Sequence, residues 1–546
     1  MDRREIQEKN FKQSDSEDDN HADDKSLLLQ EGNSFSDLKQ ALKSDQKSLT
    51  LTIDQMVDKL DVGLFHFLIV LFCGLACSGY TIVTVAYSYI IVVACDLDIE
   101  TYNKGLLNIL LMIGVLVGSG IIGRLGDAVG RRTCILISVS LSIITLIASA
   151  FTYNYTMLVV LGFFNGFGCG GTFTIAHAYC IEFFPQRYRG NGLACMTTFS
   201  CLGGLYTSAI ALVVLPYPLS IPIGVIHFNS WRLYLILSSI PLILSFCFLL
   251  FMPNSLRFMV IKGDQNRISQ VLNTINRVNS WCCKRNDSSL TTTDLTKYTI
   301  IVSSDQGELK TNKNENRDFF SHYKKFNKSP WRRRLIFLLI LWFGSCFSME
   351  GLWIWMPTVI TYYTTGKTCK MVHNSSLNNS YQYYPNSSIS NCISGPKLTS
   401  IVLDVFYGNL VALPIGIAFT ILINRIGRKW CCCFVITMSG LIALLIMWID
   451  TVLSTFILAG LYYAIANNLW LGIKIWTAEL FPTDLRATTL GLTALLGCLG
   501  TVCSLAIFTV LFHVNCIANL LLVAAVGILS GIVCLFLPDT TNTDIL

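Results

Sequence analysis

Three ionisable side chains stand within long apolar stretches of this sequence and are the first candidates for chemistry: His177, Glu350 and Lys474. An ionisable residue inside an apolar span costs free energy unless it is paired or hydrated, so each marks a functional site by default. His177 and Lys474 are 297 residues apart, and each stands five residues before a glutamate, Glu182 or Glu479. If both face inward, they form a positive ring that suits an anionic group of a small substrate.

Glu350 is expected to form a separate site. It lies about 15 residues into its apolar stretch, which puts it about 15 Å above Lys474 at a rise of about 1.5 Å per residue, further than a lysine side chain reaches. It is either a protonatable switch or a hydrogen-bonded core carboxylate. Trp355 follows, and its indole could stack on an aromatic or cationic ligand or belong to an interfacial belt. His177 alone could also be a satisfied core histidine.

The surroundings of these residues argue against enzymatic chemistry. The sequence shows no nucleotide-binding loop, metal-ligand cluster or paired nucleophile and base. We therefore expect neither catalysis nor a cofactor nor a metal, and no coupling to ATP hydrolysis.

The elements that carry the candidates are membrane spans. Of 546 residues, 53% are hydrophobic and 14% are charged, which is too apolar for a soluble protein of this size. A spanning helix needs about 20 apolar residues. Twelve such stretches are present, at 63–90, 105–123, 133–151, 157–180, 191–214, 231–252, 335–361, 398–423, 431–449, 452–477, 488–511 and 517–537.

Charge placement predicts the orientation. Cytoplasmic loops retain lysine and arginine. The connections after spans two, four, eight and ten are basic, whereas those after spans three, nine and eleven carry no lysine or arginine. Both termini are therefore expected in the cytoplasm. The net charge of +6 reflects this sidedness, and without a basic groove of interleaved aromatic residues we expect no nucleic-acid partner.

The spans divide six and six. A polar cytoplasmic linker at 254–333 separates an N-terminal half at 52–253 from a C-terminal half at 334–541, with a disordered tail at 1–51 and a short tail at 542–546. "EFFPQRYRG" from Glu182 and "ELFPTDLRA" from Glu479 repeat the shift of 297 residues. We predict an all-α membrane protein of twelve helices in two homologous halves related by a pseudo-twofold axis, which is a transporter architecture.

Charged loops recur at the same shift. "GRLGDAVGRR" begins at Gly123, and "NRIGRK" begins at Asn424. Arg131 can pair with Glu182, and Asp127 can face the positive end of a helix. Such contacts predict a cytoplasmic latch that biases a conformational equilibrium; alternatively, the arginines only anchor the topology. The candidate latch residues are Asp127, Gly130, Arg131, Arg132, Glu182, Arg189, Gly427, Arg428, Lys429, Glu479 and Arg486.

The connection at 362–397 is predicted to be a long external loop. It holds three glycosylation acceptor patterns, at Asn374, Asn378 and Asn386. Cys369 and Cys392 lie in the same loop, where an oxidising compartment would let them form a disulfide.

The N-terminal tail carries a candidate sorting signal. "DDKSLLL" from Asp23 fits an acidic dileucine pattern with Leu27 and Leu28. A sorting adaptor could bind it, or it could be a short apolar patch in a disordered segment.

These features together resemble the major facilitator superfamily. The motif Gly123-x-x-x-Asp127-x-x-Gly130-Arg131-Arg132 looks like its loop between helices 2 and 3. Further stretches resemble the synaptic vesicle glycoprotein 2-like branch, near organic ion and sugar transporters: "TIDQMVDKLDVGLFHF", "FNSWR", "PNSLRF", "GLWIWMP" and "LPDT". The resemblance implies an alternating-access carrier with helices 1, 4, 7 and 10 around a central cavity.

The chain departs from that branch at its acidic positions. An acidic pair of helix 1 is replaced by Ser78-Gly79-Tyr80-Thr81, and an aspartate of helix 10 aligns with Lys474. These differences argue against carboxylate-based cation or proton coupling.

Two functions are therefore carried forward. The first is a secondary or facilitative transporter of a small organic solute, with an anion or zwitterion favoured and a coupling ion left open. The second is a vesicle membrane glycoprotein that no longer transports and acts in binding or trafficking. Either would be a multi-pass protein of a vesicle or plasma membrane.

Overall fold

The fold is known from a computed structural model. It describes residues 50–58, 60, 62–97, 105–223, 226–280, 299–301, 331–364, 396–448, 451–466, 468–481, 483–512 and 515–540.

Eleven helices of the described residues are long and apolar enough to cross a membrane. They coincide with eleven of the twelve predicted spans. They are α3 (Leu64–Val93), α4 (Leu106–Val129), α5 (Arg131–Ser149), α6 (Tyr155–Ile181), α7 (Arg189–Val214), α8 (Ser230–Ser238) continued by α9 (Ile240–Leu249), α14 (Trp331–Thr364), α16 (Pro396–Arg425), α17 (Arg428–Trp448), α20 (Thr483–Leu511) and α21 (Cys516–Leu535).

The tenth predicted span is divided into two shorter helices, α18 (Val452–Ala466) and α19 (Leu469–Glu479). The side-chain amide of Asn468 donates to the carbonyl of Ala464 at 2.8 Å. Asparagine side chains compete with the helix backbone for such local hydrogen bonds. The break between α18 and α19 therefore lies at Asn468.

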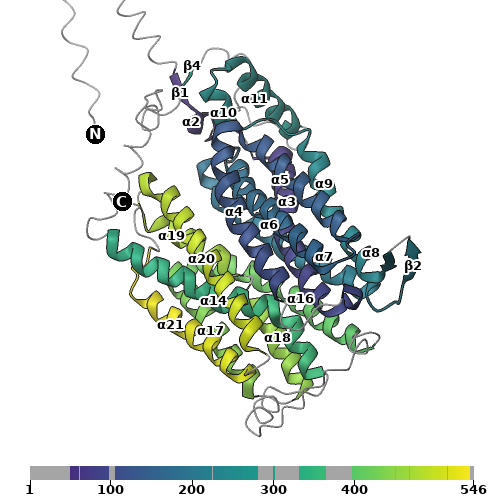
Figure 1. Ribbon diagram of the computed structural model, residues 1–546. Helices are drawn as coiled ribbons and strands as arrows, with labels where there is room; N and C mark the ends of the chain where they lie inside the picture. Colours follow the sequence, from purple (N-terminus) through teal and green to yellow (C-terminus); the bar gives the residue numbers. More distant parts are fainter. Residues whose placement is uncertain are drawn as a thin grey trace, which may run out of the picture.

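Short elements mark the two ends of the bundle (Figure 1). At one end lie α10 (Leu256–Ile261) and α11 (Gln265–Ser280), together with α2 (Ile53–Asp58) and the parallel pair of β1 (Thr50–Thr52) and β4 (Thr299–Ile301). At the other end lies the antiparallel hairpin of β2 (Ser220–Ile223) and β3 (Ile226–Asn229). These are called the linker end and the hairpin end below.

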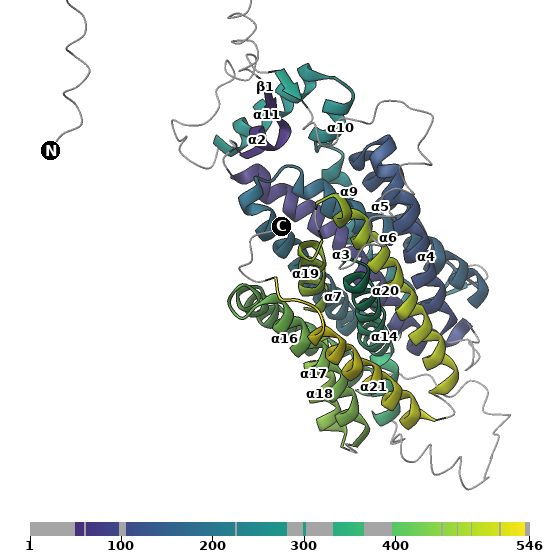
Figure 2. The same cartoon turned by 90° about the vertical axis from the view of Figure 1, so that its left-hand side faces the viewer.

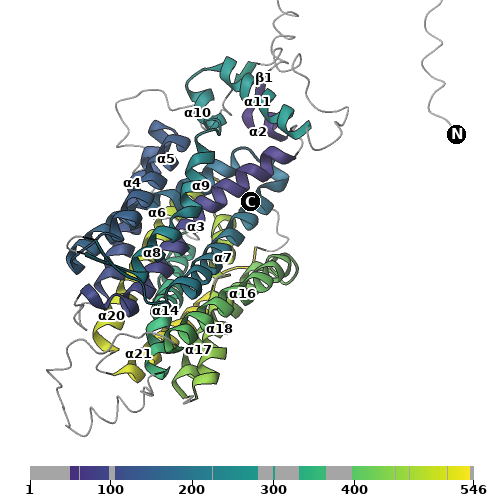
Figure 3. The same ribbon diagram turned by 90° about the vertical axis from the view of Figure 1, so that its right-hand side faces the viewer.

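The helices form two halves side by side. The N-terminal half comprises α3 to α9 and the C-terminal half α14 to α21, with α7 against α16, α4 against α20 and α3 against α14. This contact surface is called the half interface. Figures 2 and 3 show that α3 and α16 diverge from each other toward the linker end.

Small residues let helices of the N-terminal half approach closely. A Cβ atom at Gly166 of α6 would lie 2.0 Å from the carbonyl oxygen of Leu111 in α4, and one at Gly114 would lie 2.1 Å from that of Phe163. The hydrophobic effect does not drive helices together within lipid. Close backbone packing at small residues therefore contributes much of the free energy of helix association.

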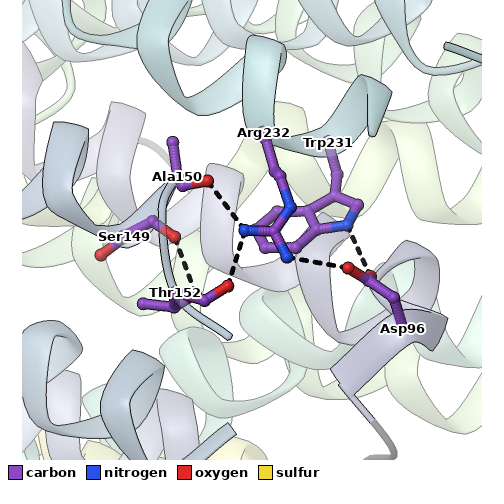
Figure 4. A network of polar contacts seen from close by, with 6 residues as sticks. All are labelled: Asp96, Ser149, Ala150, Thr152, Trp231 and Arg232. Atoms are coloured by element: carbon purple, nitrogen blue, oxygen red, sulfur yellow. Dashed lines mark hydrogen bonds and ion pairs between the residues drawn. The ribbon is translucent and has the colours of Figure 1, made fainter. Parts of the chain in front are cut away.

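A buried arginine ties the helices together at the hairpin end (Figure 4). Arg232 of α8 makes an ion pair with Asp96 at 2.9 Å, and its Nη1 donates to the carbonyls of Ala150 and Thr152 at 2.9 and 2.6 Å. Its guanidinium also stacks on Trp231, whose indole donates to Asp96. The network joins the segment after α3, the end of α5 and the start of α8. It gives a structural role to Trp231 and Arg232, the last two residues of "FNSWR".

Replacing Arg232 with alanine is expected to lower the free energy of unfolding by about 3 kcal/mol, because it leaves Asp96 and two helix-end carbonyls without their cation. Asp96 is partly exposed, which places the cost at the low end for a buried pair. Arg232→Lys should recover only part of it, since lysine lacks the planar fork. The readout is the thermal unfolding midpoint of purified protein.

The exposed pair of Arg267 and Asp264 supplies the control. Arg267→Ala should lower the free energy of unfolding by less than about 1 kcal/mol. Equal shifts of the unfolding midpoint in both variants would contradict the proposed role of burial.

Candidate functional site

Lys474 lies at the half interface. It belongs to α19, and its Nζ lies 3.9 Å from the centroid of the Phe173 ring, which α6 contributes from the other half. The Trp470 ring, one turn earlier on α19, is 5.2 Å away. No described carboxylate makes an ion pair with Lys474. The ammonium therefore makes cation–π contacts with two ring faces. Such contacts stabilise a desolvated cation by about 2 kcal/mol.

Glu350 bridges the two halves on the other side of Trp470. Its carboxylate accepts hydrogen bonds from the Trp470 indole and, at 3.3 Å, from the Tyr80 hydroxyl of α3. The residue is only 9% exposed, so these two donors offset part of the cost of removing a carboxylate from water. Trp470 thus contacts Glu350 with its indole nitrogen and Lys474 with its ring face.

The predicted separation of Glu350 from Lys474 is wrong. Trp470 spans the two residues: its indole nitrogen donates to Glu350, and its ring centroid lies 5.2 Å from the Lys474 Nζ. The sequence estimate started both helices in one plane. In the structure Trp342, eleven residues after the start of α14, donates to Thr477, two residues before the end of α19, at 2.9 Å.

His177 joins the group through Phe173. Its Nδ1 lies 2.7 Å from the carbonyl oxygen of Phe173, so this nitrogen carries a proton, and 3.6 Å from the sulfur of Cys77. The imidazole meets the Phe173 ring edge to face at 4.9 Å. His177 and Lys474 therefore lie around one phenyl ring.

Trp355 lies apart from this group. Its indole packs on Phe508 and Phe512 of the C-terminal half at centroid distances of 5.8 and 5.7 Å. It is 3% exposed, which also removes the alternative of a lipid-facing belt residue. The structure therefore brings together His177, Glu350 and Lys474 but not Trp355.

The latch charges pair within each half. Arg131 of α5 contacts Glu182 at 2.7 Å, and its equivalent Arg428 of α17 contacts Glu479 at 2.9 Å. A hydroxyl completes each pair: Ser255 donates to Glu182, and Thr540 donates to Glu479 at 2.8 Å. These hydroxyls follow the last helix of each half, within "PNSLRF" and "LPDT". Sequence reasoning quoted both stretches without assigning them a partner.

The neighbouring basic residues cap helices. Arg132 donates to the carbonyl of Leu249 at the end of α9, and the equivalent Lys429 donates to Leu535 at the end of α21. Cations are favoured at these positions because the C-terminal end of a helix carries partial negative charge. Arg189 donates to the Phe184 carbonyl.

Two glycines make the turns before these cations. Gly130 and Gly427 have φ of 108° and 110°, values that side-chain-bearing residues rarely adopt. Each separates a helix from the arginine that begins the next.

Several predicted features lie outside the described part of the chain. They comprise the side chains of Asp127 and Arg486, the acceptors Asn374, Asn378 and Asn386, the cysteines Cys369 and Cys392, and the tail residues Asp23, Leu27 and Leu28.

Sequence reasoning missed three residues of the half interface. Tyr80 and Trp470 hydrogen-bond Glu350, and Trp470 could have been found from its position one turn before Lys474. Asp404 is a buried carboxylate within α16. The rule that selected Glu350, an ionisable residue within an apolar stretch, applies to it equally.

Comparisons with known proteins agree with this architecture. Residues 69–419, more than half of the chain, match the model of the Major Facilitator Superfamily. Synaptic vesicle glycoprotein 2C of Mus musculus is 24% identical over 92% of this chain and 82% of its own length, and human synaptic vesicle glycoprotein 2B is 23% identical over 91% and 86%. The partially occluded inward open xylose transporter XylE from E. coli shares the fold, with a TM-score of 0.58 at 15% identity over 87% of this chain and 98% of that one. The chain thus belongs to the major facilitator superfamily and is a multi-pass membrane transporter rather than an enzyme.

Proposed function

We propose that this protein carries a small organic anion or zwitterion across a membrane by alternating access of its two halves. The observation that carries the proposal is Lys474, whose ammonium lies over two aromatic rings at the half interface and forms no ion pair with a described carboxylate. A substrate carboxylate or phosphate would supply an ion-pair partner at contact distance. Glu350, within the same group, would receive an amine if the substrate is a zwitterion.

The arrangement of the halves supports alternating access. Contacts across the half interface include Asn409 with Ser208 and the approach of Gly105 to Thr509, in addition to the Lys474 group. Alternating access requires that a substrate reach Lys474 from one end of the bundle at a time. We propose that the linker end is the cytoplasmic one, because the basic loops lie there.

The cellular setting is also a proposal. The vesicle glycoproteins to which the chain is similar favour a vesicle membrane, and a plasma membrane is the alternative. Glycosylation of Asn374, Asn378 and Asn386, a disulfide between Cys369 and Cys392, and adaptor binding at Leu27 and Leu28 would fit either location.

Uptake into proteoliposomes tests the proposal. Purified protein should accumulate members of a panel of organic anions or zwitterions, and Lys474→Ala should reduce this uptake about 10- to 100-fold, since a hydrogen bond to a charged group contributes about 1.5–3 kcal/mol. Lys262→Ala is the matched control. Lys262 also lies over a phenyl ring, that of Phe258, but its side chain is exposed at the end of α10, away from the half interface.

The outcomes separate the candidate functions. Uptake of cations or sugars that survives Lys474→Ala would contradict an anion site. No uptake of any solute at either acidic or neutral external pH would favour the binding and trafficking role.

A further inference from the structure

A basic and aromatic surface at the linker end of the C-terminal half takes no part in the Lys474 group. Its residues come from three spans, and α21 packs against both of the others, α14 and α17. Two cations and three aromatic residues form the surface, which is called the collar below: Arg333, Phe337, Lys429, Trp430 and Phe536. The collar surrounds the point where α14 and α17 begin and α21 ends.

Contacts join the members of the collar. The Arg333 guanidinium lies 5.8 Å from the centroid of the Phe337 ring, and this ring stacks on Phe536 at 5.6 Å with 13° between the ring planes. The Lys429 Nζ donates to the carbonyl of the last residue of α21, directly before Phe536, at 2.8 Å. It also lies 5.8 Å from the centroid of the Trp430 ring. Both cations are therefore fixed beside the end of α21.

The collar stands at the end of apolar stripes that face outward. On α14, the exposed residues Ile336 and Ile340 follow Arg333 by three and seven positions, which places all three on one helix face. On α17, the exposed Phe434 follows the exposed Trp430 by four positions. Exposed apolar faces of membrane spans contact acyl chains, and aromatic rings at their ends lie at the level of the head groups. The collar therefore lies where a lipid head group would meet the protein.

The cations of the collar call for an anionic partner. Neither Arg333 nor Lys429 forms an ion pair with a carboxylate of the described residues. Arg332, also exposed, adds a further positive charge beside Arg333. The occupant of this surface must place an anionic group at the cations and hydrocarbon along the stripes. An anionic phospholipid does both, whereas a soluble anion or an acidic peptide meets only the first condition.

We propose that the collar binds the head group of an anionic phospholipid in the leaflet at the linker end. The planar guanidinium of Arg333 offers paired donors to the phosphate oxygens, and the Lys429 ammonium has two N–H donors besides the one bound to α21. The acyl chains lie along Ile336 and Phe434. A lipid seated here joins the ends of α14, α17 and α21. The inference does not depend on transport or on which solute is carried.

Titration of the full chain in detergent with phosphatidylserine tests the proposal. Native mass spectrometry measures the fraction of protein that retains the lipid, and the thermal unfolding midpoint should rise with that fraction, because the lipid binds the folded state. Arg333→Gln should weaken binding about 5-fold, the effect expected for one cation at a membrane surface. The double variant with Lys429→Gln should weaken it about 25-fold. Glutamine is chosen because its amide can still donate to the end of α21.

Matched variants control for charge and folding. Arg333→Lys keeps the charge and should lose less affinity than Arg333→Gln. Lys262→Gln removes another exposed cation that lies over a phenyl ring at the linker end, but in the N-terminal half, and should bind as the wild type does. Without phosphatidylserine, the glutamine variants should unfold at the wild-type temperature, because the side chains that they change form no ion pair with a described carboxylate.

Three results would overturn the proposal. The first is equal affinity of the wild type and the double variant for phosphatidylserine. The second is equally tight binding of phosphatidylcholine, which carries no net charge. The third is the same stabilisation by free inorganic phosphate at equal concentration, which would assign the collar to a soluble anion. None of these results bears on the uptake experiment, so failure of this proposal and failure of the transport function are distinguishable.

Discussion

Gly166→Ala is expected to sharply reduce the yield of folded protein, although it adds only one methyl group. The new Cβ would lie 2.0 Å from the carbonyl oxygen of Leu111 and 3.1 Å from the amide nitrogen of Val115. Both are backbone atoms of α4, so no side chain can rotate away. The helices must separate, and the neighbouring contacts at Gly114 and Gly170, also under 2.5 Å, would be lost with them.

The expected cost exceeds about 3 kcal/mol, the upper end for overpacking relieved by side-chain movement. Size-exclusion profiles and thermal unfolding midpoints in one detergent measure it. Gly120→Ala is the matched control on α4, because nothing lies within 4 Å of its Cβ position. This control should be neutral or slightly stabilising, since alanine restricts the unfolded chain more than glycine does. Equal behaviour of the two variants would show that the close approach of α4 and α6 does not limit stability.

The second large effect concerns the latch pairs. Glu182→Gln keeps the shape of the side chain but removes the charge that Arg131 contacts. A charge-assisted hydrogen bond contributes about 1.5–3 kcal/mol, so an equilibrium that depends on this pair should shift about 10- to 100-fold. Glu479→Gln should act similarly through Arg428, because the C-terminal half repeats the contact.

Two measurements detect this shift. Uptake rate reports the transport cycle, and limited proteolysis of the linker end reports which state predominates. The exchanged pair Arg131→Glu with Glu182→Arg should restore part of the activity, but not the contact of Arg131 with the Ala178 carbonyl or that of Glu182 with Ser255. Asp264→Asn, in an exposed pair, is the control and should change little. Unchanged uptake and proteolysis in both glutamate variants would leave the arginines as anchors of topology alone.

The sequence by itself determined the architecture and the pairing of Arg131 with Glu182 within one half. Apolar stretches of spanning length predicted the helices, because a bilayer demands about 20 apolar residues from each. The shift of 297 residues then predicted that Glu182 and Glu479 would have equivalent surroundings. Their arginine partners could be predicted because each pair joins helix ends that a short loop or one intervening helix keeps close together.

Only the tertiary structure decided what meets across the half interface. The contact of Trp470 with both Glu350 and Lys474 depends on how far α14 extends beyond α19 and on the break at Asn468. Likewise, the contact of Asn409 with Ser208 depends on the rotation of α16 against α7. Spacing along the chain specifies the position of a residue on its own helix, but the tilt, overhang and rotation of helices from different halves result from the packing of all their side chains together.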